Sequence, residues 1–176
     1  MQFNFTRKYI KPVQKLIIWL EGLNPKARSV NPIPSRSVIP PPSQGLNLTV
    51  MSFNIRRGTR EDGQNHWIFR RPLVREILER YRPEVLGLQE ALDFQISAIR
   101  TMLPGYEKVG IGNLGGSKGL HTAIFYDAQR FAVSEAGTLW FSKTPHIPRS
   151  RGWGNIIPRT CTWVRLIDRN THQAFY

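Results

Sequence analysis

Met51-Ser-Phe-Asn54 and Leu86-Gly-Leu-Gln-Glu90 are the two stretches of sequence that decide the fold. Each is an apolar run that predicts a buried β-strand, and each ends in a polar residue, Asn54 or Glu90. An amphipathic helix that ends at Arg82-Pro83 is predicted between them by apolar residues at helical spacing: Leu73, Val74, Ile77, Leu78 and Tyr81. Because a strand-helix-strand unit brings both strand ends to one edge of a sheet, where ligands of α/β proteins bind, we expect Asn54 and Glu90 to converge.

The chain beyond this unit continues with one more helix and then a series of strands. Leu92, Ile96, Ile99 and Leu103 mark the second helix, which Pro104-Gly105 ends. Further strands are predicted over residues 106–111, 121–126, 130–141 and 160–167, with a glycine-rich loop over residues 112–119. Helices early in the chain and consecutive strands later predict an α/β sandwich with a mixed sheet.

Composition divides the chain near residue 46. Residues 1–46 form a basic segment with a proline-rich, polyproline-like linker, and residues 47–176 carry the regular pattern of a folded domain. The first part holds seven Lys and Arg against one Glu, the second eighteen against eleven acids, for a net charge of +13. This charge favours a polyanionic partner, such as nucleic acid or an anionic membrane surface, although a basic surface that only keeps the protein in solution would look the same.

The sequence contains no strong targeting or redox signal. The apolar run at residues 16–20 is too short to span a bilayer or to form a secretory signal, although a short interfacial helix there stays open. We therefore expect a cytoplasmic protein without stable membrane insertion; no oligomeric state is indicated. The single cysteine, Cys161, excludes an intramolecular disulfide, and its strand-like neighbours predict a buried thiol.

Six segments together resemble the endonuclease/exonuclease/phosphatase superfamily, and its bacterial members in particular. The resemblance covers about residues 48–176 and rests on Ser52-Phe-Asn54, Arg82-Pro-Glu-Val85, Gly87-Leu-Gln-Glu90, Ala123-Ile-Phe-Tyr126, Gly137-Thr-Leu-Trp-Phe-Ser-Lys-Thr-Pro145 and Pro158-Arg-Thr-Cys-Thr-Trp163. It implies a two-sheet α/β sandwich that carries a nuclease or phosphatase, a hydrolase of phosphoesters that uses Mg²⁺, or Mn²⁺ in its place.

The resemblance also implies roles for four residues. Glu90 matches the metal-binding carboxylate, and Asn54 would lie beside it and hold the metal, its water or a phosphate oxygen; hard oxygen ligands of this kind suit Mg²⁺. Arg159 stands where some relatives place an arginine on the scissile phosphate, although a surface arginine that contacts only solvent would look the same. His121 is a further catalytic candidate, but relatives carry an acidic residue where Leu120 stands. A histidine on an apolar strand is also often only a core or surface group.

The later motifs of the family are missing from the sequence. Relatives continue with an Asn-Thr-His strand end, a Gly-Asp-x-Asn turn and a closing Asp-His pair. Asn170-Thr-His172 spells the first motif, but it lies in a predicted hairpin turn between Asp168-Arg169 and Gln173–Tyr176. The chain thus resembles the N-terminal part of a longer enzyme, truncated before the second half. We expect the second sheet to be absent and the fragment to be inactive.

Two non-catalytic functions remain open beside the hydrolase: a basic nucleic-acid-binding module and a membrane-surface module. The substrate, whether DNA, RNA, a phosphoinositide or another phosphoester, is not indicated, because selectivity resides in loops.

Overall fold

The predicted strand-helix-strand unit is present and opens the described part of the chain. It consists of β1 (Val50–Asn54), α2 (Trp67–Tyr81) and β2 (Val85–Ala91), with a short 3₁₀ turn, η1 (Gly63–Asn65), before the helix. β1 and β2 are parallel neighbours, and Asn54 lies opposite Gln89. The structure is a computed structural model that describes residues 46–58 and 61–176, so the predictions for residues 1–45 lie outside the described residues.

Helix α2 begins earlier than its apolar pattern predicts, because two residues in its first turns do not fit the pattern of an amphipathic helix. Arg70 is a charged residue at a buried position, and Pro72 lies inside the helix. Proline has no backbone N–H, so at the sixth position of α2 it removes one helical hydrogen bond and is not expected from the pattern of a regular helix. The helix ends as predicted at Arg82, which adopts a left-handed conformation (φ 40°) and donates its N–H to Leu78.

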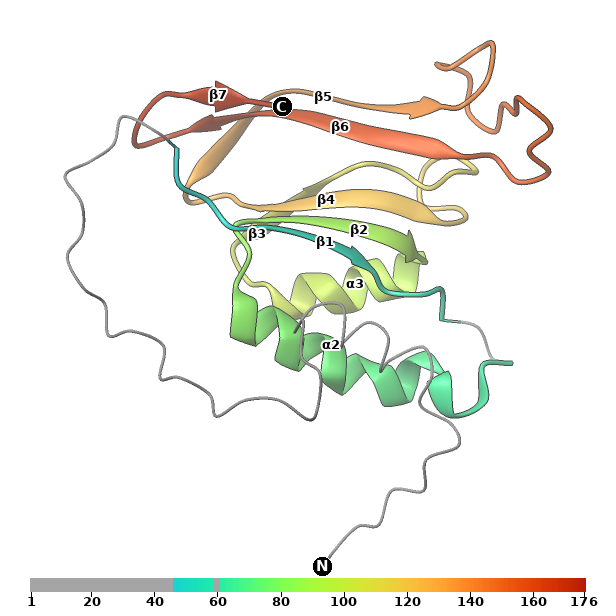
Figure 1. The fold of residues 1–176 in the computed structure, drawn as a ribbon, viewed down its shortest axis with the longest axis horizontal. Helices are drawn as coiled ribbons and strands as arrows, with labels where there is room; N and C mark the ends of the chain where they lie inside the picture. Colours follow the sequence, from blue (N-terminus) through green and yellow to red (C-terminus); the bar gives the residue numbers. More distant parts are fainter. Residues whose placement is uncertain (1–45, 59–60) are drawn as a thin grey trace, which may run out of the picture. The chain divides into compact units, whose positions relative to one another are not determined.

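The first sheet has the strand order β1-β2-β4-β3. Its remaining strands are β3 (Tyr106–Val109) and β4 (His121–Asp127), both close to their predicted ranges, and α3 (Asp93–Met102) links β2 to β3. Helices α2 and α3 lie against one face of this sheet (Figure 1). Buried residues such as Leu78, Leu88, Ile99 and Phe125 form the core of this layer.

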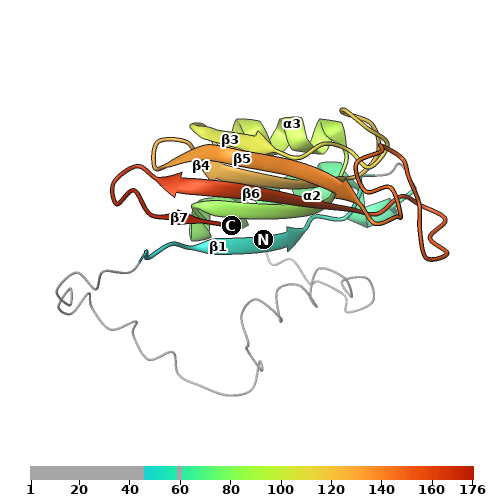
Figure 2. The same ribbon diagram turned by 90° about the horizontal axis from the view of Figure 1, so that it is seen from above.

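A second sheet is present, and the expectation that it would be absent is wrong. It consists of β5 (Phe131–Trp140), β6 (Thr160–Asp168) and β7 (Ala174–Phe175) in the order β5-β6-β7, all antiparallel. β5 and β6 are long strands that pair with each other rather than with the first sheet. Figures 1 and 2 show this sheet stacked on the face of the first sheet that the helices leave free. An apolar cluster of Val85, Tyr126, Phe131, Val164 and Leu166 joins the two sheets.

Arg130, in the turn between β4 and β5, connects the two sheets with polar contacts. Its guanidinium pairs with Glu84 before β2, donates to Asp168 at the end of β6 (2.9 Å) and donates to the carbonyl oxygen of Asn47 (2.7 Å). Asp168 is buried. Burial acts to raise the pKa of its carboxyl, but the hydrogen bond from Arg130 and the N–H groups of Asn170 and Thr171 outweigh burial and lower the pKa.

The same hydrogen bonds show that Asn170-Thr-His172 lies in a turn between two strands. Asp168 accepts from the backbone N–H groups of Asn170 and Thr171 in the turn between β6 and β7. The hairpin turn predicted there is confirmed. The buried thiol predicted for Cys161 is wrong, since this residue is exposed near the start of β6. No helix among residues 46–58 and 61–176 is long and apolar enough to cross a membrane.

Candidate functional site

Glu90 occupies a β-bulge near the end of β2. Pairing between β2 and β4 shifts there: Leu88 lies opposite Ala123 and Ala91 opposite His121, so β2 carries one extra residue. Glu90 has a φ of 59°, a conformation that is unfavourable for residues other than glycine. Strain of this kind persists only where the surrounding structure enforces it and is common at functional sites. The bulge thus interrupts the strict alternation of faces and sets the direction of an exposed carboxylate.

Asn54 ends the neighbouring strand, directly opposite the residue that precedes Glu90. Its Oδ1 accepts a hydrogen bond from the N–H of Arg56 (2.9 Å), which shapes the turn after β1. Arg56 connects the two strand ends electrostatically. The pKa of its guanidinium is raised, mainly by a hydrogen bond to Asp62 and to a smaller extent by Glu90. The two strand ends are therefore neighbours, while a shared ligand of Asn54 and Glu90 stays a prediction.

The carboxylate of Glu90 has no hydrogen bond or ion pair with any residue in the described part of the chain. An exposed carboxylate that is held by a strained backbone and has no partner among the described residues is available for a ligand. Its oxygen atoms, together with the amide oxygen of Asn54, are the hard donors that Mg²⁺ accepts. Within residues 46–58 and 61–176, however, no three His, Cys, Asp or Glu side chains are grouped as a metal site.

A buried side chain on α3, Gln95, holds the segment that follows Asn54. Its Oε1 accepts from the N–H groups of Gly58 (2.8 Å) and Leu92 (3.1 Å), and its Nε2 donates to the carbonyl oxygen of Arg56 (3.0 Å). Sequence reasoning missed this role. The signal was a glutamine on a helix face that is otherwise apolar, where a buried amide must find hydrogen-bond partners.

Arg70 supports the same segment from α2. Its guanidinium, buried to more than nine-tenths, donates to the carbonyl oxygens of Ile55, Arg56 and Asn65. Burial lowers the pKa of Arg70, and the nearby carboxylate of Asp62 opposes that shift. Two buried polar side chains from different helices thus hold the backbone next to the ends of β1 and β2.

His121 lies inside the sandwich rather than at an open surface. It is buried, and its Nδ1 lies 3.1 Å from the carbonyl oxygen of Ala91, the residue after Glu90. Burial lowers the pKa of the imidazole, so the neutral form dominates at neutral pH. This contact fastens β4 to β2 beside the bulge. A direct catalytic role for His121 stays a prediction.

Arg159 directly precedes β6, and β6 starts at the end of the sandwich where β1 and β2 end (Figure 1). It is exposed and precedes β6, and its carbonyl oxygen accepts from the N–H of Phe141 (2.8 Å). The adjacent Thr160 hydroxyl lies 3.0 Å from that of Thr122, which follows His121 on β4. A cavity of about 310 Å³ opens between the sheets here, lined by Gly87, Leu88, Gln89, Thr122, Ala123, Ile124, Phe141, Thr160, Cys161 and Thr162.

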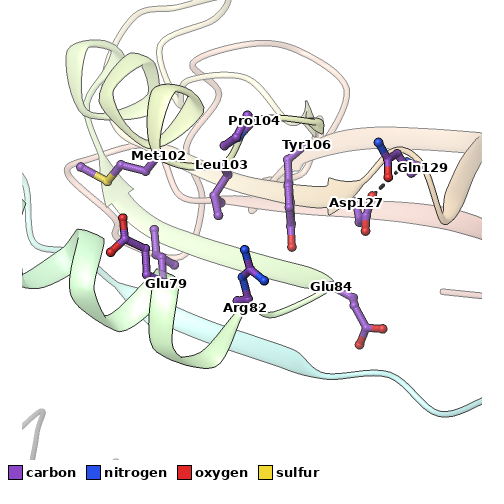
Figure 3. A pocket seen from close by; sticks show the side chains of 10 residues that line it. Glu79, Arg82, Glu84, Met102, Leu103, Pro104, Tyr106, Asp127 and Gln129 are labelled. Carbon is purple, nitrogen blue, oxygen red and sulfur yellow. Dashed lines mark hydrogen bonds between the residues drawn. The ribbon is translucent and has the colours of Figure 1, made fainter.

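A second cavity, of about 410 Å³, lies at the opposite end of β2 (Figure 3). Its polar groups are engaged in structural contacts. Tyr106 donates to the carbonyl oxygen of Pro83 (2.9 Å), Asp127 accepts from the N–H of Gln129 (2.9 Å), and Glu84 pairs with Arg130. Because these carboxylates already have partners, the candidate site is the end that carries Glu90.

The fold and parts of the sequence match solved structures. A mannosyl-6-phosphatase from Bacteroides thetaiotaomicron shares 34% identity with a TM-score of 0.70, over 73% of this chain and 49% of that protein. An endonuclease/exonuclease/phosphatase family protein from the same species shares 34% identity (TM-score 0.69; 73% and 46% covered). One from Bacteroides vulgatus shares 28% identity (TM-score 0.70; 73% and 49% covered).

The human Nocturnin catalytic domain, at 19% identity and a TM-score of 0.56, shares the fold alone. The chain spans about half the length of these solved structures. No family model matches the chain, and no curated protein matches it.

Proposed function

Because the chain belongs to the endonuclease/exonuclease/phosphatase superfamily, we propose that residues 46–176 supply the metal-binding part of a phosphoester hydrolase. The observation that carries the proposal is Glu90, an exposed carboxylate without a partner in the described residues and held in a bulge at φ 59°. A carboxylate that served only the fold would be expected to form an ion pair or a cap. Glu90 would bind Mg²⁺, or Mn²⁺ in its place.

Asn54 contributes a second oxygen to this site. One lone pair of its Oδ1 accepts from Arg56, and the other remains for the metal, its water or a phosphate oxygen. Bound Mg²⁺ would neutralise the charge that develops on the phosphoryl oxygens. Gln95 and Arg70 keep the backbone after Asn54 fixed, so that its amide stays oriented when substrate arrives.

Arg159 is the group that we assign to substrate phosphate. It is exposed, it forms no ion pair with a described residue, and a guanidinium fork matches two phosphate oxygens. We assign no general base among the described residues, since the candidate His121 is buried and bonded to backbone. Positioned bases contribute about 10²–10⁴ in rate, so we expect no turnover above background by residues 1–176 alone.

Phosphomonoesters of sugars are the first substrates to assay. The sequence identity of 34% to a mannosyl-6-phosphatase supports this class over DNA or RNA, which remain the alternatives. The chain joined to the C-terminal half of that phosphatase should hydrolyse mannose 6-phosphate in the presence of Mg²⁺, and Glu90→Ala should abolish the activity.

Metal binding by the 176-residue chain tests the proposal without activity. Mn²⁺ gives an electron paramagnetic resonance signal when free, so loss of that signal on titration with protein measures binding. We expect Glu90→Gln to weaken binding at least about tenfold, because the charged ligand is lost. Glu135→Gln, which removes an exposed carboxylate from β5, is the matched control and should leave binding unchanged. Equal affinity of all three proteins for Mn²⁺ would remove Glu90 from the metal site.

A further inference from the structure

The β5–β6 loop, residues 141–159, exposes a group of large apolar side chains. Ile147 is 57% exposed, Trp153 75% and Ile156 84%, and Phe141 and Ile157 are also exposed. Figures 1 and 2 show the loop extending past the strands at the end where β5 stops and β6 starts. Single exposed apolar residues are common on proteins, but several of them on one loop indicate an interaction surface.

The loop is held in a defined conformation by its own hydrogen bonds. Ser142 is buried; its hydroxyl donates to that of Ser150 (2.7 Å) and accepts from the N–H of Thr144 (3.0 Å). Ser150 in turn donates to the carbonyl oxygen of Thr144 (2.9 Å), and the N–H of Phe141 closes the base of the loop on Arg159. The apolar residues are therefore presented outward by an ordered scaffold, which lowers the entropy lost on binding.

The charge of the loop has one sign. Lys143, Arg149, Arg151 and Arg159 are all exposed, and no Asp or Glu occurs in the sequence from Ala136 to Ile167. None of the four cations forms an ion pair with a residue in the described part of the chain. The surface thus combines apolar side chains with uncompensated positive charge, so a complementary partner must be anionic and apolar at once.

We propose that the β5–β6 loop docks on an anionic phospholipid membrane surface. Tryptophan suits the headgroup region, isoleucine side chains gain free energy in the acyl boundary, and Lys and Arg attract anionic lipids. Single-stranded nucleic acid would match the cations and Trp153 but would leave the isoleucines in water. The inference is independent of the proposed hydrolysis, although the loop lies at the end of the sandwich that carries Glu90.

A fluorophore on the loop tests this docking in the full-length chain. Cys161 is the only cysteine, so Cys161→Ser with Ile156→Cys gives one labelling position for an environment-sensitive nitrobenzoxadiazole dye. The probe is a vesicle of phosphatidylcholine with roughly one third phosphatidylserine. We expect a blue shift with vesicles and quenching by nitroxide-labelled acyl chains. Ile68→Cys, at a comparably exposed apolar position on α2, is the matched control and should stay in water.

Co-sedimentation with the same vesicles measures the contribution of each kind of side chain. Trp153→Ser with Ile156→Ser should weaken partitioning about tenfold, and Lys143→Ser with Arg151→Ser should reduce its dependence on salt. A label at 156 that stays aqueous overturns the proposal, whether or not the chain sediments with vesicles, because binding would then arise elsewhere. If these substitutions reduce the affinity for single-stranded DNA but leave vesicle binding unchanged, the loop binds nucleic acid instead.

Discussion

Replacing Gln95 with leucine should destabilise the protein measurably. The side chain is fully buried, and its amide serves three backbone groups. Leucine has a similar volume, so the cost of a cavity is small. The N–H groups of Gly58 and Leu92 lose their partner, whereas the carbonyl oxygen of Arg56 keeps Arg70 (3.1 Å). Two partly buried donors left without acceptors cost about 2–3 kcal/mol together.

Thermal unfolding followed by circular dichroism measures this loss. A chain of this size shifts its Tm by about 2–4 °C per kcal/mol, so Gln95→Leu should melt roughly 5–10 °C below the parent. Gln129→Leu makes the same chemical change at an exposed position and should stay within about 2 °C. If Gln95→Leu melts together with the parent or with this control, the hydrogen bonds of Gln95 do not hold the segment after β1, and the reasoning fails.

Three further outcomes follow from single side chains. Glu90→Gly should raise the free energy of unfolding by about 1 kcal/mol, because glycine tolerates φ 59°, and it should remove Mn²⁺ binding together with the carboxylate. A urea titration in which Glu90→Gln is equally stabilised would contradict the first of these reasons. Burial lowers the pKa of His121, so in mildly acidic solution the unfolded chain binds a proton that the folded chain does not. The contribution of His121 to the free energy of unfolding should be fully present above about pH 6.5 and should decrease below that pH. The slope of the free energy of unfolding against pH should be smaller in His121→Gln. Arg130→Met should cost about 3 kcal/mol or more in urea unfolding because it leaves Asp168 buried without its cation, whereas Arg71→Met on the exposed face of α2 should be nearly neutral.

The first layer of the fold could be predicted because its signals are local. Alternating and helical apolar patterns located β1, β2, α3 and β4 to within a few residues. The start of α2 was missed since Arg70, a charged residue, occupies a buried position that periodicity alone assigns to solvent. The strands of the second sheet were also recognised, but not their pairing, because the pattern of one strand does not specify its partner.

The candidate site, like the fold, could be predicted only in part from the sequence. The family motif drew attention to Asn54 and Glu90, and hydrogen-bonded register makes their strand ends neighbours. The bulge at Glu90 has no signal in the sequence, since no glycine marks its left-handed residue. The sequence marks Gln95 as an unusual residue on an apolar helix face, but its partners and those of Arg70 lie far away in the chain, so the sequence does not identify them.

The three polar contacts of Arg130 have a consequence for how the folded protein unfolds. One guanidinium joins the residue before β2, the last residue of β6 and the backbone of Asn47, so the sheets cannot separate unless Arg130 loses either its contact with Asp168 or its contacts with Glu84 and Asn47. Backbone amides in β2 and β6 should then exchange with deuterium at the same rate, through a shared global opening, rather than as two independent units. The sandwich behaves in this respect as one foldon, although its two sheets share no backbone hydrogen bond among their paired strands.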